Sequence, residues 1–235
     1  DYKSQKRKEI QVQITASKEG QEQIYKNEIQ SFLKTVKQPI CSLDIEVWMP
    51  AIPYYQGTKP FQQIPFLFSM VSENENKLET YSYFKPIDED NRLAFLETIL
   101  EKTKPFNTIL MYDKSLEESV LNQLMEIYPT YKMDIIELKN KIVDIAEPIQ
   151  KANYYHPNMN GNFTLKSIAP ILNTDFDFNA LPIQSGITAM YIYESLLLQT
   201  NSIEAEQTKA QLIEYCELDA LVTIEFYKYL VIKTA

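Results

Sequence analysis

The chain has 235 residues, of which 45% are hydrophobic and 12% aromatic, and its formal net charge is −9. This composition excludes an intrinsically disordered protein and supplies enough apolar side chains for one fairly large domain. The acidic balance argues against a protein that holds nucleic acid on a broad basic surface, but it leaves a metal-centred enzyme open.

Glycine and cysteine usage excludes further classes of site. Four glycines are few, and the chain contains no G-x-G-x-x-G or Walker-type phosphate loop. Cys41 and Cys216 lack the spacing of a zinc site or a disulfide framework, which predicts a reducing, cytoplasmic location. Since no apolar run approaches the roughly 20 residues of a membrane span and no signal peptide opens the chain, we expect no membrane partner.

The order of apolar patterns predicts an α/β fold with a mixed sheet. Residues 1–37 are interpreted as an N-terminal tail and a lead-in helix, and residues 38–235 as the domain itself. Residues 1–25 are polar without sustained periodicity, and the chain starts without Met, so we expect a piece of a longer protein. In chain order, the predicted elements are a helix over 23–36, strands over 43–48, 66–71 and 78–84, a helix over about 93–100 capped by Asp88, a strand over 109–112, a helix over 115–127, a strand over 141–145, a short helix broken at Pro148, a helix over 165–172 capped by Thr164, and helices over 186–199 and 204–232.

Two carboxylates stand side by side on the first predicted strand. Side chains alternate along a strand, so Asp44 and Glu46 share one face while Leu43, Ile45 and Val47 share the other. Like charges this close raise each other's pKa unless a cation lies between them, and a divalent metal held by oxygen ligands provides that cation. The alternative is an edge strand whose polar face meets water.

A second pair of acids lies where the fourth predicted strand turns into a helix. Asp113 and Glu117 occupy the carboxyl end of that strand, where open α/β sheets bind ligands. The alternative is a capping role, with Asp113 or Ser115 at the N-cap and Glu117 as a first-turn acid favoured by the helix dipole.

The last helix carries a third acid on an apolar face. Tyr215 and Asp219 are four residues apart and share that face with Leu212, Cys216 and Ala220. An acid in apolar surroundings needs a partner or a metal. A capping or surface role for Asp219 is the alternative.

Together these three patterns resemble the DEDD exonucleases, tyrosine branch, which have the ribonuclease-H-like fold of DnaQ-type proofreading domains. The resemblance spans about residues 38–232 and implies a mixed five-stranded sheet flanked by helices. Four shorter runs resemble a bacterial domain family usually found C-terminal to a RecB-like nuclease domain of the CRISPR-associated kind, which implies a covalently attached N-terminal nuclease domain as a partner. The runs are Pro50-Ala51-Ile52-Pro53, Gln62-Gln63-Ile64-Pro65-Phe66, Tyr154-Tyr155-His156-Pro157 and Tyr215-Cys216-Glu217-Leu218-Asp219.

The resemblance implies a site for two Mg²⁺ or Mn²⁺ ions. Asp44, Glu46 and Asp219 would hold the first ion, and Asp44 would bridge to the second. Glu117 falls where the superfamily normally has Asp, so its reach to the second ion departs from the family pattern. Asp113, which we group with the substrate-binding residues, falls where the superfamily often has Asn.

Further residues are assigned to catalysis and to the substrate. The resemblance implies that Tyr215 orients the attacking water. Terminal nucleotides could stack on Trp48 or Tyr54, with packing under the loop as the alternative for either ring. Lys166 could meet a phosphate, with a solubilising surface role as the alternative. His156 is grouped with the substrate contacts, with a loop hydrogen bond as its alternative role.

The resemblance implies a metal-dependent 3′–5′ exonuclease that acts on DNA or RNA, with a single-stranded 3′ end as the expected substrate. Two divalent ions about 4 Å apart activate water and stabilise the leaving oxygen, and hard oxygen ligands suit Mg²⁺ and Mn²⁺. The alternative is a ribonuclease-H-like module that has lost efficient catalysis and binds nucleic acid or acts as a scaffold for an attached nuclease.

Overall fold

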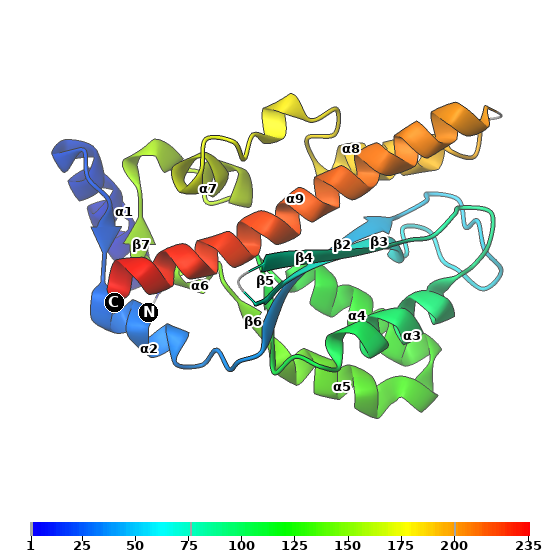
Figure 1. The fold of residues 1–235 in the computed structure, drawn as a ribbon, viewed down its shortest axis with the longest axis horizontal. Helices are drawn as coiled ribbons and strands as arrows, with labels where there is room; N and C mark the ends of the chain where they lie inside the picture. Colours follow the sequence, from blue (N-terminus) through cyan, green and yellow to red (C-terminus); the bar gives the residue numbers. More distant parts are fainter. Residues whose placement is uncertain (1, 76, 200) are drawn as a thin grey trace.

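A computed structural model describes residues 2–75, 77–199 and 201–235. Its centre is a five-stranded mixed sheet in the order β4-β3-β2-β5-β6, flanked by helices (Figure 1). The predicted α/β class is therefore confirmed, and the arrangement is consistent with a ribonuclease-H-like fold. The strands are β1 (Gln23–Ile24), β2 (Ile40–Trp48), β3 (Ile64–Asn74), β4 (Lys77–Phe84), β5 (Thr108–Met111), β6 (Ile142–Asp144) and β7 (Tyr154–Tyr155). The helices are α1 (Tyr2–Glu19), α2 (Lys26–Leu33), α3 (Arg92–Thr103), α4 (Ser115–Ile127), α5 (Lys132–Lys141), α6 (Glu147–Gln150), α7 (Leu165–Leu172), α8 (Gly186–Ser195) and α9 (Ser202–Thr234), with 3-10 turns at Pro129–Tyr131, Pro157–Met159 and Phe178–Ala180.

β2 is the central strand of the sheet. It pairs antiparallel with β3 on one side and parallel with β5 on the other. Leu43, Ile45 and Val47 belong to a core shared with α3, α4 and α5. Asp44 and Glu46 lie on the opposite face, which α9 crosses (Figure 1). The alternative of an edge strand open to water is therefore wrong.

The periodic segments of the chain form the predicted elements, with differences at their ends. α4 has the bounds that the sequence predicts. The predicted helix over 23–36 is shorter, because residues 23–24 instead pair with Tyr154 and Tyr155 as the β1–β7 ladder. The residues of α5 contain no helical signal, because only Ile135 and Leu138 are buried there and most other positions are charged or polar.

Both predicted helix caps need correction. Asp88 does not cap α3, whose N-cap residue is Asn91 without a side-chain cap bond. The acid engaged there is Asp90, which accepts hydrogen bonds of 2.8 and 2.6 Å from the Arg92 guanidinium. Thr164 does occupy the N-cap position of α7, but its side chain makes no cap hydrogen bond.

The N-terminal segment, polar and without a predicted element, forms α1 and packs on the rest of the molecule. Val12 and Ala16, one turn apart, are buried in a core shared with Tyr154 and Tyr155. Lys8 Nζ also donates a 2.5 Å hydrogen bond to Asn153 Oδ1. The segment therefore contributes apolar burial that its composition alone does not indicate.

We expect removal of residues 1–20 to lower the free energy of unfolding by about 2 kcal/mol or more, the value of burying a side chain such as Val12. Urea unfolding of the full and shortened chains measures the difference. The substitution Ile10→Ala, at an exposed position of α1, is the control for changes that do not touch the core. An unchanged free energy of unfolding in the shortened chain would contradict the prediction.

Candidate metal centre

Three carboxylates from two elements meet beneath α9. Asp44 and Glu46 project from β2, and Asp219 projects from α9; one oxygen of each lies within 4.8 Å of the others. Glu46 and Asp219 are 7% and 8% exposed, whereas Asp44 is half-buried. The structure thus brings together the three acids that the sequence places on one strand face and one helix face.

Hydrogen bonds hold α9 against β2 close to these three acids. Ser42 Oγ donates to the carbonyl of Ala220 at 2.7 Å, and Cys216 Sγ donates to Asp44 Oδ2 at 3.2 Å. Both contacts join the strand to the helix within one turn of Asp219. The separation of the carboxylates is therefore set by the sheet–helix packing rather than by flexible side chains alone.

Glu117 approaches the same site from the side of the sheet. β5 ends at Met111 whereas β2 continues to Trp48, so the chain after β5 is free to turn and start α4 beside the far half of β2. Glu117 is 5% exposed, and its Oε2 has no hydrogen-bond partner in the described part of the chain. Glu117 does lie in the first turn of α4, as its alternative role predicts, but it is buried with an unpaired oxygen and is not a solvated residue.

The turn before α4 is shaped by two other acids. Asp113 has a φ of 55°, in the left-handed region, and its carboxylate accepts the Ser115 hydroxyl at 2.9 Å. Asp144, at the end of β6, accepts the backbone N–H groups of Asp113 and Ala146 at 2.9 Å each. No described side chain caps α4, so the capping alternative for Asp113 and Ser115 is also wrong.

Crowding and burial raise the pKa values of all four acids. Burial, reinforced by the Glu117 carboxylate, raises the pKa of Asp44 to about 7. Burial likewise raises the pKa of Glu117 to about 8. The pKa values of Glu46 and Asp219 lie well above their usual range, first through burial and then through Asp44. Among the described residues, no Lys or Arg forms a salt bridge with any of the four.

The donor set fits a hard divalent cation. Carboxylate oxygens are the ligands that Mg²⁺, Mn²⁺ and Ca²⁺ take, and a cation between these acids would remove the repulsion that raises their pKa values. Asp44, Glu46 and Asp219 would hold such an ion, and the unpaired oxygen of Glu117 is a further donor nearby. Glu117 is not one of the three acids whose oxygens lie within 4.8 Å of one another.

Tyr215 and Lys166 lie at the edge of the acid cluster. Burial, and then the charge of Asp219, raises the pKa of Tyr215, so its hydroxyl keeps its proton at neutral pH. The ammonium group of Lys166 lies 5.3 Å from the centroid of the Tyr215 ring and donates to the carbonyl of Gln184. Its charge lowers the pKa values of Asp44, Glu46 and Asp219, although burial outweighs this effect at each acid.

A family model described as a domain of unknown function, DUF2779, matches residues 41–164, which is more than half of the chain. The chain belongs to this family. No curated protein matches it. The matched residues include Asp44, Glu46 and Glu117, whereas Lys166, Tyr215 and Asp219 lie in the C-terminal part of the DUF2779 chain beyond the match.

Two predicted stacking residues of the DUF2779 chain differ in their access. Trp48 is 1% exposed and packs edge-on against Tyr55 and Tyr193, so it cannot stack on a nucleotide, and its prediction as a substrate contact is wrong. Its alternative role, packing under the loop, is confirmed. Tyr54 is 47% exposed, with its ring edge-on to Trp48 at 5.3 Å, and remains accessible.

His156 lies away from the acids, and its assignment as a substrate contact stays a prediction. The charged side chains that act on the pKa of His156 are Glu22 and Lys233. Lys233 is 14 positions beyond Asp219 on α9, or roughly 21 Å along the helix axis. His156 Nδ1 accepts the backbone N–H of Asn158 at 3.1 Å, which confirms the alternative of a loop hydrogen bond.

A cavity of about 290 Å³ opens beside Glu46, and the other residues of its wall are not among the predicted site residues. Ser185 and Gly186, at the start of α8, form part of its wall, and a Cβ on Gly186 would lie 3.6 Å from Glu46 Oε2. The rest of the wall is mainly apolar: Val47, Met49, Leu116, Ile187 and Met190. No pattern within one segment of the sequence predicts this cavity, because residues from separate segments form its wall.

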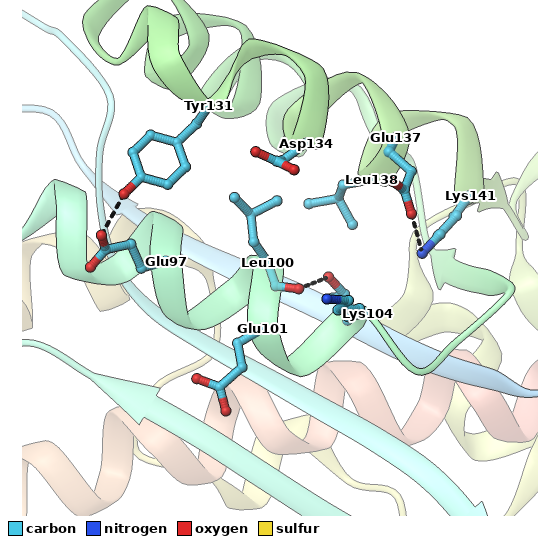
Figure 2. A pocket seen from close by; sticks show the side chains of 10 residues that line it. Glu97, Leu100, Glu101, Lys104, Tyr131, Asp134, Glu137, Leu138 and Lys141 are labelled. Atoms are coloured by element: carbon cyan, nitrogen blue, oxygen red, sulfur yellow. Dashed lines mark hydrogen bonds and ion pairs between the residues drawn. The ribbon is translucent and has the colours of Figure 1, made fainter.

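A second cavity, of about 360 Å³, lies between α3 and α5 on the other side of the sheet (Figure 2). Its acids are spread along the two helices rather than gathered. Glu137 pairs with Lys141 at 3.1 Å, and Glu97 accepts the Tyr131 hydroxyl at 2.5 Å. This cavity therefore lacks the converging carboxylates of the metal centre.

Within the described ranges, no helix combines the length and apolar character needed to cross a membrane.

Proposed function

We propose that this DUF2779 chain is a metal-dependent 3′–5′ exonuclease that hydrolyses phosphodiester bonds at DNA or RNA ends. The observation that carries the proposal is the meeting of Asp44, Glu46 and Asp219 within 4.8 Å, with Glu46 and Asp219 buried, Asp44 half-buried, and no basic partner in a salt bridge among the described residues. Such a group of acids is costly without a cation, and oxygen-bound divalent cations are the usual catalysts of phosphodiester hydrolysis.

Each residue of the site has a distinct task in this proposal. Asp44, Glu46 and Asp219 would hold one Mg²⁺ or Mn²⁺ ion, and Glu117 would contribute to a second. The bound ions supply an activated water and neutralise charge on the leaving oxygen. Tyr215, which keeps its proton, orients the water as a hydrogen-bonding group and does not act as a base.

Two features beside the acids suit a strand end. Lys166 offers a cation close to the carboxylates, where a phosphate would lie. The cavity next to Glu46 is mainly apolar, which suits a flat nucleobase better than a second charged group. Tyr54 is exposed and available for stacking.

A second candidate function rests on Glu117. Its longer side chain stands where the resembling exonucleases normally have Asp, and its Oε2 lies unpaired in the interior. If Glu117 cannot serve the second ion, the domain would bind nucleic acid with little or no catalysis and would serve a nuclease domain attached at its N-terminal side.

The decisive experiment is degradation of end-labelled oligonucleotides by the purified chain. A matched panel of single- and double-stranded DNA and RNA is incubated with Mg²⁺, Mn²⁺ or EDTA. We expect stepwise shortening from the 3′ end with metal and no shortening with EDTA. Metal binding and nucleic-acid binding without degradation of any substrate would instead establish the scaffold function.

We expect Lys166→Met to raise KM about tenfold or more, the value of one hydrogen bond to a charged group, with a smaller change in kcat. The reason is the loss of the cation that lies beside the acids and faces an incoming phosphate. Steady-state kinetics on the best oligonucleotide measures both constants. Lys102→Met is the matched control. The Lys102 ammonium group also lies over a tyrosine ring, 4.7 Å from the centroid of Tyr81, but Lys102 belongs to α3 and not to the acid cluster. Equal KM values for the two variants would contradict the role of Lys166.

A further inference from the structure

Cys216 contacts the metal centre from the helix side. It is fully buried on α9, next to Tyr215, and its Sγ lies 3.2 Å from Asp44 Oδ2 and 3.6 Å from the Asp44 carbonyl oxygen. The thiol donates its hydrogen to the carboxylate. One oxygen of Asp44 is therefore held by a fixed donor.

A row of hydroxyl groups continues from this thiol across the sheet. Ser69 faces Asp44 in the β2–β3 register, and Ser82 faces Ser69 in the β3–β4 register. Ser69 Oγ and Ser82 Oγ are 2.9 Å apart, and Ser82 Oγ donates to Glu217 Oε1 at 2.6 Å. Ser69 is fully buried, and its side chain lies beside that of Cys216.

This row is unusual in its surroundings. The neighbouring contacts between α9 and the sheet are made by apolar side chains such as Leu212, Ala220 and Ile224. Buried polar groups in such an interface are retained only where each is hydrogen-bonded, and here the row links Asp44 at one end to Glu217 at the other. Because Cys216 and Glu217 are consecutive on α9, the row fixes the rotation of the helix against β2.

We propose that Cys216 is a positioning residue for the metal centre: its thiol, which lies beside Ser69, holds Asp44 in the orientation that binds the ion. The proposal rests on the proposed function, because it assumes that Asp44 is a metal ligand. Partners that orient a ligand in this way commonly change metal affinity 10- to 100-fold when they are removed. A cysteine that merely filled space would make no such difference.

The chain contains a matched control for this proposal. Cys41 is also fully buried and lies on β2, but it packs in the apolar core on the opposite face of the sheet. Cys41→Ala and Cys216→Ala remove the same atoms from equally buried sites. They differ in whether a contact to Asp44 is lost.

The experiment measures Mn²⁺ affinity by titration calorimetry on the full chain, together with thermal unfolding in EDTA. We expect Cys216→Ala to weaken Mn²⁺ binding about 10- to 100-fold, Cys216→Ser to retain affinity within about threefold because its hydroxyl can still donate, and Cys41→Ala to bind like the wild type. Both alanine variants should lose thermal stability in EDTA, which shows that lost packing is not the cause of lost affinity.

The following results would overturn either the positioning role of Cys216 or the proposed function. Wild-type affinity in Cys216→Ala, or equal losses in Cys216→Ala and Cys41→Ala, would overturn the positioning role while leaving the metal centre intact. Absence of Mn²⁺ binding by the wild-type chain would overturn the proposed function, and this inference with it. If Cys216→Ala does not fold, Ser69→Ala takes its place, with weakened Mn²⁺ binding supporting the role of the row and unchanged binding rejecting it.

Discussion

Asp44→Asn is expected to abolish nucleic-acid hydrolysis, with a fall in kcat of about 10³-fold or more. Asp44 shares the group of three converging carboxylates and stands closest to solvent among them, so its charge serves both to bind the ion and to face the substrate. Losing several kcal/mol of stabilisation of the transition-state charge corresponds to a fall of this size, at about 1.4 kcal/mol per tenfold.

The same substitution separates catalysis from folding. Asn keeps the size of Asp44 but removes a charge from a site where neighbouring acids repel, so the metal-free variant should unfold at the same temperature as the wild type or higher. Asp134→Asn, at an exposed acid of α5 near the second cavity (Figure 2), is the control and should keep full activity. Hydrolysis by Asp44→Asn at the wild-type rate would refute the catalytic assignment.

The parts of the fold that the sequence predicts are those in which one segment contains the whole signal. The alternation of apolar and acidic side chains in residues 43–48 is enough to predict β2, because the strand's own side chains show which face is apolar and which is polar. The apolar spacing and first-turn acids of α4 predict its bounds. α1 and α5 bury few residues each, such as Val12 and Ile135, and these are buried only because other elements cover them. So few apolar residues in one segment are not enough to predict that other elements will bury them.

The site shows the same division. Asp44 and Glu46 at i, i+2, and Tyr215 and Asp219 at i, i+4, share faces whatever the rest of the chain does, so these pairs could be predicted. Trp48 continues the face of Asp44 and Glu46 along β2, but Tyr193 of α8 packs over its ring and closes that end of the strand. Where a covering helix lies is a property of the whole fold.

The metal-free protein is expected to be less stable at pH 8.5 than at pH 5. Asp44 and Glu117 have folded-state pKa values of about 7 and about 8, above the ordinary values of 3.8 and 4.5. The folded state therefore holds more protons than the unfolded state between about pH 4 and pH 8, and stability falls as pH rises through this window. His156 acts in the opposite sense, because burial lowers its pKa, but it is one partly exposed group against several buried acids. Since a tenfold difference in proton affinity between the folded and unfolded states is worth about 1.4 kcal/mol, the net loss should be several kcal/mol.

Divalent cations should reverse this loss where the acids are ionised. At a concentration of 100 times Kd, a bound ion adds about 2.7 kcal/mol to the free energy of unfolding, and at pH 5 it must compete with protons for the same oxygens. Mg²⁺ or Mn²⁺ should therefore raise the unfolding temperature strongly at pH 8.5 and little at pH 5, measured by calorimetry against EDTA. Glu117→Gln should flatten the pH dependence of the metal-free protein, because it removes one of the titrating groups without changing the shape of the side chain. A metal-free stability that stays level or rises between pH 5 and pH 8.5 would mean that these carboxylates are not held together as the structure places them, and the case for a shared cation would fail with it.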